Sequence, residues 1–245
     1  MAAPPWFYAP RENWTGTEVE LSREESHHAL KVMRISPPDV LTVTDGRGVV
    51  ARCAAARAEE DLLVAEVLET SEHRRPRPEI AVYQGAAKGH KVDDVVERLA
   101  ELGTAEICVY SSKRSVVRWD RAKIDRLGER WAAIARSVAK QSRNPFLTQA
   151  SGGVSWTELV RRIAREPLAI VLWEEAEFPL RTALSGHADR IALVIGPEGG
   201  LATEEAEELA DAGAQLISLG PQIPRTQNAP VVAVSALLYH YGLIG

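Results

Sequence analysis

The strongest constraint on the fold is a regular alternation of short apolar runs and helical patterns after residue 78. The apolar runs are EIAVYQGA, AEICVYS, PLAIVLW, RIALVIG and AQLISLG. The helical patterns fall near 91–102, 120–141, 155–165, 203–212 and 229–242. Strands that alternate with helices in this way form a mostly parallel sheet with helices on both faces. The pattern therefore predicts an α/β fold for this part of the chain.

A different pattern precedes it. The stretch DVLTVTDGRGVVARCAAA holds two runs of period two around an Asp-Gly turn, which is typical of a β-hairpin. DLLVAEVLET follows, so we expect a small β-barrel over residues 1–72. Residues 73–78, HRRPRP, are polar and proline-containing and are the best linker in the chain. The α/β domain would then cover 79–245.

Charge is distributed unevenly along the chain. The net charge is −5, yet residues 113–143 contain ten Lys and Arg against Asp120, Asp125 and Glu129. Acidic regions flank this segment on both sides. Two interpretations stay open: a solvated helix face, or a surface for an anionic partner such as RNA.

Other features exclude several classes of protein. The N-terminus lacks the basic start and apolar core of a signal peptide, and no apolar run approaches the roughly 18 residues of a membrane span. We therefore expect a cytoplasmic protein with no membrane partner. Cys53 and Cys108 are isolated and are expected to be buried apolar residues, and the six histidines show no ligand spacing, so no metal is expected.

Two loops share one design. LVIGPEGGLATEE (193–205) and LGPQIPRTQNAP (219–230) each end an apolar run at Gly-Pro and lead into a helical pattern. The loops lie at the carboxyl ends of predicted strands, where open α/β sheets bind ligands. Neither matches a P-loop or Gly-x-Gly-x-x-Gly. We expect Thr203 to cap the next helix, so that Glu204 and Glu205 in its first turn repel a pyrophosphate.

A ligand that uses backbone contacts without phosphate fits these loops better. S-adenosylmethionine has an adenine, a ribose diol and a sulfonium cation that tolerates Glu198 nearby. Prolines 197, 221 and 224 fix φ, so both loops are predicted to be rigid, as preorganised binding prefers. The alternative is that Gly196, Gly199 and Gly200 only form a tight turn.

The ordered motifs resemble the ribosomal RNA small-subunit methyltransferase E family, in the SPOUT class. IGPEGGL and LGPQIPRTQNAP resemble the end of that family. Earlier segments agree in order: AAKGHKVDDVVERLAELG, SSKRSVVRW and AKQSRN. HHALKVMRISPPDVLTVTDGRG resembles the family's PUA-like RNA-binding barrel. The match covers nearly the whole chain.

This resemblance implies properties that spacing alone does not. The C-terminal domain would be a SPOUT-type methyltransferase with a deep trefoil knot that holds S-adenosylmethionine in a bent pose. The active unit would be a homodimer. Methyl transfer would go to N3 of one uridine in small-subunit (16S) ribosomal RNA, either naked or in the assembled small subunit.

We expect the two loops to form opposite walls of one cofactor site. The predicted cofactor-binding residues are Leu172, Glu174, Ile195, Gly196, Pro197, Glu198, Gly199, Gly200, Leu219, Gly220, Pro221, Ile223, Arg225 and Thr226. Uridine N3 attacks a methyl group only as an anion, so Arg225 is predicted to stabilise the negative charge that develops on the base. A phosphate clamp or a structural salt bridge is the alternative for Arg225. Glu198 is the candidate base, or else a residue that holds the loop.

The predicted RNA-binding residues are Lys88, Lys91, Arg114, Arg118, Gln141 and Arg143. Most suit phosphate contacts, and Gln141 suits a base edge. Arg118 beside Trp119 is a candidate stacking plane for an unpaired base. Trp131 lies on the apolar face of the predicted 120–141 helix and is assigned to the core.

Some positions depart from the family pattern. Gln222 stands where the family often has a basic residue, Pro224 replaces Leu, and Gln227-Asn228 replaces Glu-Thr. Lys140 replaces the usual glutamate. If a glutamate at 227 were the general base, this chain would lack it. Two rival functions stay open, a non-catalytic RNA-binding protein and an NAD-dependent α/β enzyme.

Overall fold

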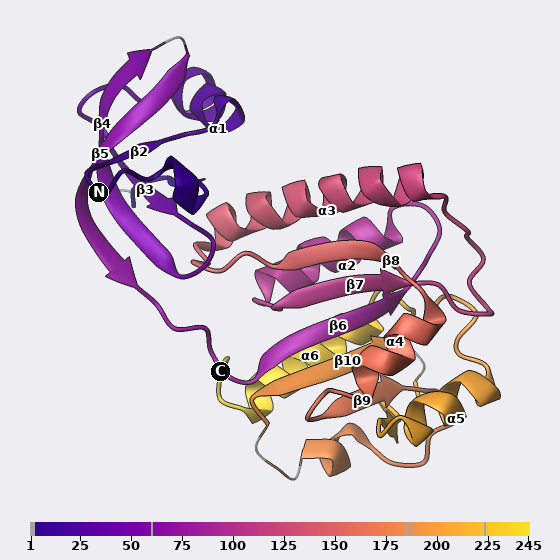
Figure 1. The fold of residues 1–245 in the computed structure, drawn as a ribbon. Helices are drawn as coiled ribbons and strands as arrows, with labels where there is room; N and C mark the ends of the chain where they lie inside the picture. Colours follow the sequence, from indigo (N-terminus) through magenta and orange to yellow (C-terminus); the bar gives the residue numbers. More distant parts are fainter. Residues whose placement is uncertain (1–2, 60, 185, 187, 223) are drawn as a thin grey trace. The chain divides into compact units, whose positions relative to one another are not determined.

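The structure, a computed structural model, describes residues 3–59, 61–184, 186, 188–222 and 224–245. It divides into two compact units (Figure 1). The N-terminal unit comprises residues up to Arg75 together with Arg136–Leu147, and the C-terminal unit comprises Pro76–Ala135 and Thr148–Gly245. Helix α3 (Arg121–Ser142) therefore contributes residues to both units. The domain boundaries at 72 and 79, with a linker between them, stay a prediction.

The N-terminal unit is built on a five-stranded sheet in the order β1-β3-β4-β5-β2. Its strands are β1 (Trp6–Tyr8), β2 (Glu18–Glu20), β3 (Val40–Thr44), β4 (Val49–Glu59) and β5 (Leu62–Glu72). Its short helical segments are η1 (Arg11–Asn13), α1 (Arg23–His27) and η2 (His28–Val32).

The predicted hairpin is confirmed. β3 and β4 pair in antiparallel fashion, and Gly46 and Gly48 in the turn have φ of 72° and 115°, which glycine adopts without steric cost. Side chains from all five strands meet in one core, where Phe7, Val19 and Leu41 are fully buried. The sheet therefore encloses its own core, as expected of a small barrel.

The end of α3 packs within the N-terminal unit. The Lys140 Nζ atom lies 2.6 Å from Glu25 Oε1, and the Glu25 side chain is only 7% exposed. Beyond the helix, the Thr44 hydroxyl donates a hydrogen bond to the Pro145 carbonyl at 3.1 Å. Lys140, which replaces a glutamate of the resembled family, thus gains a buried partner on α1.

The C-terminal unit contains a six-stranded sheet in the order β11-β9-β10-β6-β7-β8. Its strands are β6 (Glu79–Gly85), β7 (Glu106–Tyr110), β8 (Gln149–Val154), β9 (Ala169–Leu172), β10 (Arg190–Ile195) and β11 (Gln215–Ile217). Its helices, besides most of α3, are α2 (Lys91–Glu101), α4 (Trp156–Ile163), η3 (Leu180–Leu184), α5 (Thr203–Asp211) and α6 (Ala229–His240). Every strand pair is parallel, so the predicted parallel sheet is confirmed. The sequence pattern missed one strand, β8.

Each face of this sheet carries its own core. Residues of α2, α3 and α6 pack on one face, where Trp131 is 1% exposed as predicted. Residues of α4 and α5 pack on the other, and Figure 1 shows these two groups of helices on opposite sides of the strands. Cys53 and Cys108 are buried free thiols, and burial raises the pKa of both to about 11, so neither is a nucleophile at neutral pH.

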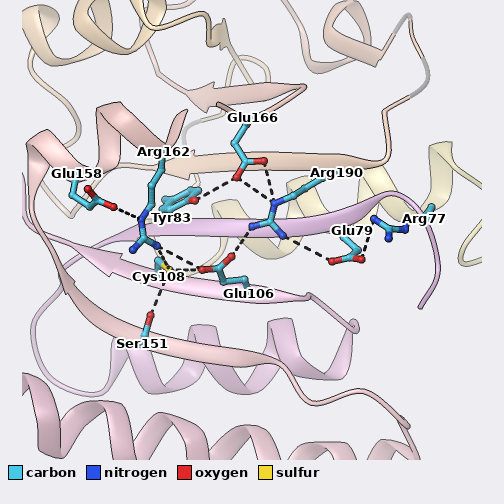
Figure 2. A network of polar contacts seen from close by, with 10 residues as sticks. All are labelled: Arg77, Glu79, Tyr83, Glu106, Cys108, Ser151, Glu158, Arg162, Glu166 and Arg190. Carbon is cyan, nitrogen blue, oxygen red and sulfur yellow. Dashed lines mark hydrogen bonds and ion pairs between the residues drawn. The ribbon is translucent and has the colours of Figure 1, made fainter. Parts of the chain in front are cut away.

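The amino-terminal edge of the sheet carries a network of charges (Figure 2). β10 begins at Arg190, whose guanidinium lies 2.6 Å from Glu106, 3.1 Å from Glu166 and 3.9 Å from Glu79. Glu106 and Glu79 are the first residues of β7 and β6. Arg162 of α4 also approaches Glu106, at 3.7 Å. These contacts join the starts of three adjacent strands.

The opposite, carboxyl-terminal edge is where the chain can bind a ligand. β6 is the first strand of the unit, and the strand order runs from it in two directions, to β7 on one side and β10 on the other. Such a switch point leaves a crevice outside the strand ends. Both Gly-Pro loops begin at this edge, directly after β10 and near the end of β11.

Candidate cofactor pocket and basic loop

A cavity of about 290 Å³ opens at the carboxyl ends of β9, β10 and β11. This volume is close to the roughly 300 Å³ at which small-molecule pockets begin. The lining residues are Leu172, Trp173, Glu174, Ile195, Gly196, Pro197, Glu198, Gly200, Leu201, Ser218, Leu219, Gly220, Gln222, Pro224, Arg225, Thr226 and Ala229. Residues from both Gly-Pro loops are among them.

Gly200 gives the first loop its shape. Its φ is +70°, and an added Cβ would lie 2.6 Å from the Glu174 Oε1 atom, so a larger residue would meet both backbone strain and a carboxylate. Glu174 follows β9 and lines the same cavity. The loop and the end of β9 are therefore packed as closely as glycine permits.

A buried relay of hydrogen bonds joins the two loops. The Gln84 side chain, 1% exposed at the end of β6, donates from Nε2 to the Thr226 hydroxyl at 2.8 Å. That hydroxyl in turn donates to the Gly196 carbonyl at 2.6 Å. The Gln84 Oε1 atom is buried without a partner among the described residues. Gln84 thus holds the second loop against the first. Its buried Oε1 atom, which has no hydrogen-bond donor among the described residues, reduces the stability gained.

Glu198 is held by one ammonium group and one backbone amide. Its Oε1 atom accepts a hydrogen bond from the Lys88 backbone N–H at 2.9 Å and lies 3.1 Å from the Lys91 ammonium. Burial acts to raise the pKa of this carboxyl, but the hydrogen bonds from Lys88 and Lys91 outweigh it and hold the pKa below its usual range. A carboxylate with a lowered pKa is a poor proton acceptor at neutral pH.

Arg225 is the exposed cation of the cavity wall. Its guanidinium has no ion pair or hydrogen bond with any residue that the structure describes, although its side chain lines the cavity. A structural salt bridge, one alternative role for Arg225, is therefore not observed among these residues. The side chain is available to a bound ligand.

The segment 111–120, here called the basic loop, follows β7 and lies against the first Gly-Pro loop. The Lys113 backbone N–H donates to Glu205 at 2.7 Å, and the Arg114 guanidinium donates to the Gly199 carbonyl at 3.4 Å. Lys113, Arg114 and Arg118 are exposed.

Within the described part of the chain, no cluster of His, Cys, Asp and Glu is arranged to hold a metal.

Comparison with known proteins identifies the fold and the family. The RNA methyltransferase domain matches residues 73–238, and the RNA methyltransferase PUA domain matches residues 21–68. The ribosomal RNA small subunit methyltransferase E of Mycobacterium bovis is 35% identical over 235 residues, which cover 94% of this chain and 90% of the relative. This chain belongs to the ribosomal RNA small subunit methyltransferase E family.

Two further members support the assignment. The Bacillus subtilis enzyme of the same name is 29% identical and is covered over 91% of both chains. The solved structure of the Neisseria gonorrhoeae family member, bound to S-adenosyl methionine, is 25% identical with a TM-score of 0.81 over 97% of this chain and 98% of that one. The family and the fold class predicted from the sequence, an α/β domain after a PUA-like domain, are confirmed.

Most of the predicted cofactor residues that the structure describes line the cavity, but two do not. Gly199 and Pro221 are not part of the lining, and Ile223 falls outside the described residues. Gly199 instead contacts the basic loop, where an added Cβ would lie 3.3 Å from the Arg114 carbonyl. The cofactor roles of the lining residues remain predictions.

Several lining residues were not predicted as cofactor contacts. They are Trp173, Leu201, Ser218, Gln222, Pro224 and Ala229. Trp173 and Ser218 directly follow β9 and β11, so their position at strand ends was the available signal. Gln222 and Pro224 depart from the family pattern, and both face the cavity.

The predicted RNA-binding residues fall in both units. Lys88, Lys91, Arg114 and Arg118 belong to the C-terminal unit, whereas Gln141 and Arg143 belong to the N-terminal unit. Lys91 is partly neutralised by Glu198. Trp119 is half-buried and its ring packs on Trp131 with centroids 5.9 Å apart, and its stacking role stays a prediction.

One sequence prediction about the first loop is wrong. Helix α5 begins at Thr203, so Ala202 and not Thr203 is its N-cap. Alanine has no side-chain acceptor, and the Ala202 backbone N–H donates instead to the Glu205 carboxylate at 3.0 Å. The expected effect on a phosphate persists, since a carboxylate already occupies this helix terminus.

Proposed function

We propose that this protein transfers a methyl group from S-adenosylmethionine to N3 of one uridine in small-subunit ribosomal RNA. The observation that carries the proposal is the cavity between the two Gly-Pro loops in a chain of the methyltransferase E family. On its wall lies Arg225, whose guanidinium has no partner among the residues that the structure describes. The RNA-binding alternative without catalysis leaves this cavity unexplained.

No helix among the described residues is long and apolar enough to cross a membrane. We place the protein in the cytoplasm because that is where its proposed substrate is found.

The residues of the cavity fit this cofactor better than a dinucleotide. Backbone N–H and C=O groups of the two loops can form hydrogen bonds with an adenine. The carboxylates of Glu174 and Glu198 can accept hydrogen bonds from a ribose diol and tolerate the positive charge of the sulfonium. At the start of α5, the N-cap amide of Ala202 already donates to the Glu205 carboxylate, which places a negative charge where a pyrophosphate would bind. This helix terminus therefore disfavours NAD.

When bound, S-adenosylmethionine supplies an activated methyl group on a sulfonium. The protein must then favour the anion of the uridine, because N3 has no free lone pair until its proton leaves. Arg225 would stabilise the charge that develops on the base oxygens, and such electrostatic help is usually the largest catalytic term. Because its guanidinium has no other partner in the described structure, no existing contact must break first.

Glu198 has a different role in this proposal. Its lowered pKa disfavours proton abstraction, while its contacts with Lys88 and Lys91 tie the first loop to the start of α2. We assign Glu198 to holding the loop in place. Lys88 and Lys91 would thereby be placed beside the bound RNA.

The RNA would contact both units. In the C-terminal unit, Lys88, Arg114 and Arg118 would bind phosphates, and in the N-terminal unit the PUA domain, Gln141 and Arg143 would bind other groups of the RNA. The basic residues give this acidic protein a local surface that attracts RNA despite its net charge of −5.

The active unit would be a homodimer with the predicted trefoil knot in each C-terminal domain. Helix α6 is predominantly apolar, yet Val232 and Tyr239 are 49% and 73% exposed. A predominantly apolar helix is normally buried, so these side chains are fitted to a second copy of the chain. Light scattering should give the mass of a dimer for the wild type and a lower mass for Val232→Glu. A monomeric wild type would refute the dimer.

The test of function is methyl transfer from radiolabelled S-adenosylmethionine to small-subunit RNA from a strain that lacks the enzyme. Naked RNA and assembled subunits are assayed side by side, and mass spectrometry locates the product. We expect 3-methyluridine at one position. A methyl group on another base, or on the ribose, would overturn the proposed acceptor.

A further inference from the structure

A buried carboxylate lies between the basic loop and the first Gly-Pro loop. Glu205, in the first turn of α5, is 1% exposed. Its Oε1 atom accepts the Lys113 backbone N–H at 2.7 Å, and its Oε2 atom accepts the Ala202 backbone N–H at 3.0 Å. One side chain thus holds the backbone of both loops.

The chemistry of Glu205 makes both contacts matter. A buried carboxylate is costly unless hydrogen bonds satisfy it. No Lys, Arg or His of the described residues forms an ion pair with Glu205, so the two backbone amides are its observed partners. If the basic loop moved away, Oε1 would remain buried without its donor. The free energy of placing Lys113 therefore depends on where Ala202 and the Glu205 carboxylate lie.

A second contact reinforces the first. The Arg114 guanidinium donates to the Gly199 carbonyl at 3.4 Å, and an added Cβ on Gly199 would lie 3.3 Å from the Arg114 carbonyl oxygen. The basic loop therefore rests directly on the loop that forms one wall of the cavity. No residue of 111–120 lines the cavity itself, so the basic loop has no direct contact with what the cavity holds.

We propose that Glu205 is a positioning residue that couples RNA binding by the basic loop to cofactor binding in the cavity. This inference rests on the proposed function of both loops. A cofactor that holds residues 196–201 in place also fixes the Ala202 end of the Glu205 bridge. The Lys113 end then presents Arg114 and Arg118 to the RNA. By linkage, RNA must tighten cofactor binding by the same factor.

The first experiment measures this factor. Fluorescence anisotropy gives the Kd of the unmethylated small-subunit RNA with and without saturating S-adenosylhomocysteine, which cannot react. We expect the wild type to bind RNA about fivefold or more tightly with this ligand, within the usual range of coupling. Glu205→Gln keeps the shape but offers an NH₂ group to one of the two backbone N–H groups, so the ratio should fall toward one.

Glu208→Gln is the matched control. Glu208 lies on the same helix, is exposed, and accepts a hydrogen bond from Trp156 rather than from either loop. It should keep the wild-type ratio. The inference is overturned if Glu205→Gln also keeps that ratio, or if the wild-type ratio is already one.

Hydrogen exchange provides a readout that needs no variant. Binding of S-adenosylhomocysteine to the wild type should slow exchange in the peptide 111–118, where the Lys113 amide bonds to Glu205. Unchanged exchange there, with protection at 196–201, would overturn the coupling even if Glu205→Gln fails to fold. A wild type that does not bind S-adenosylhomocysteine at all would instead count against the proposed function.

Discussion

Replacing Arg190 with methionine should destabilise the C-terminal unit without harming the active site. Arg190 is the shared cation of Glu106 and Glu166, whose side chains are 29% and 10% exposed. Methionine keeps the apolar stem but leaves these carboxylates partly buried without their common partner. Breaking a buried pair costs about 3–5 kcal/mol, and the partial exposure of this one favours the lower end. At about 3 kcal/mol, Tm should fall by about 6–12 °C for a chain of this size.

The loss should depend on pH in a defined direction. Burial acts to raise the pKa of the Glu106 carboxyl, but hydrogen bonds from Cys108 and Arg190 outweigh burial, so the pKa lies below its usual range. A carboxyl with a lowered pKa in the folded state contributes stability above its unfolded pKa of about 4.3, and loses it as pH falls through the folded value. The difference between wild type and Arg190→Met should be full at pH 7 and shrink below about pH 4.

Thermal unfolding followed by circular dichroism at pH 7 and at pH 3.5 measures both effects. Arg161→Met is the control, because the pair of Arg161 with Glu158 has side chains that are 59% and 36% exposed. It should leave Tm within about 2 °C of the wild type. Methyl transfer at 25 °C should be unchanged in both variants, since the network lies at the sheet edge opposite the cavity. A Tm loss in Arg190→Met no larger than that of Arg161→Met would show that this network is not stabilising.

Three further outcomes test the site. Arg225→Ala should keep the cofactor Kd within a few-fold while single-turnover methyl transfer falls by roughly a hundredfold, and near-normal turnover would remove Arg225 from the mechanism. Replacing Arg114 and Arg118 by alanine should weaken RNA binding and reduce the salt slope by about two, whereas an unchanged slope would mean that neither side chain binds phosphate. Gln84→Met removes an unpaired buried oxygen along with the bond to Thr226, so Tm should hold or rise while calorimetry shows weaker cofactor binding. Thr226→Val should weaken binding less in the Gln84→Met background than in the wild type, because the bond between Gln84 and Thr226 is already lost there, and full additivity of the two would contradict the relay.

The sequence predicted most of the fold because strands buried on both faces are continuous apolar runs. β8 was missed for a physical reason. Its sequence, QASGGV, is polar and contains Gly152 and Gly153, which argue against a strand. The structure shows why Gly152 is there: an added Cβ would lie 2.8 Å from the Trp131 ring. Gly152 therefore lowers the predicted strand propensity of this segment, and it is also the residue that leaves space for the Trp131 ring in the core.

The site was predicted less completely. The sequence motifs predict that both loops lie at one site. They do not predict contacts between side chains that are far apart in the sequence, because such contacts produce no local pattern. The sequence predicts only that Glu205 repels phosphate, because nothing in it indicates that the Glu205 carboxylate also accepts a hydrogen bond from the Lys113 amide. In the same way, no sequence pattern predicts the ion pair of Lys140 with Glu25, because the two residues lie in segments that are far apart in the chain.

The position of β6 at the centre of its sheet has a consequence for synthesis of the chain. β6 is the first strand of the unit to leave the ribosome, and its β7 neighbour follows soon after, but Glu79 pairs on the other side with Arg190 of β10. At about 5–20 residues per second, one edge of this apolar strand waits on the order of 5–20 s for its partner. An unpaired apolar edge is a template for intermolecular pairing. The nascent protein is therefore most prone to aggregate while the residues between β7 and β10 are being translated, before either wall of the cavity exists.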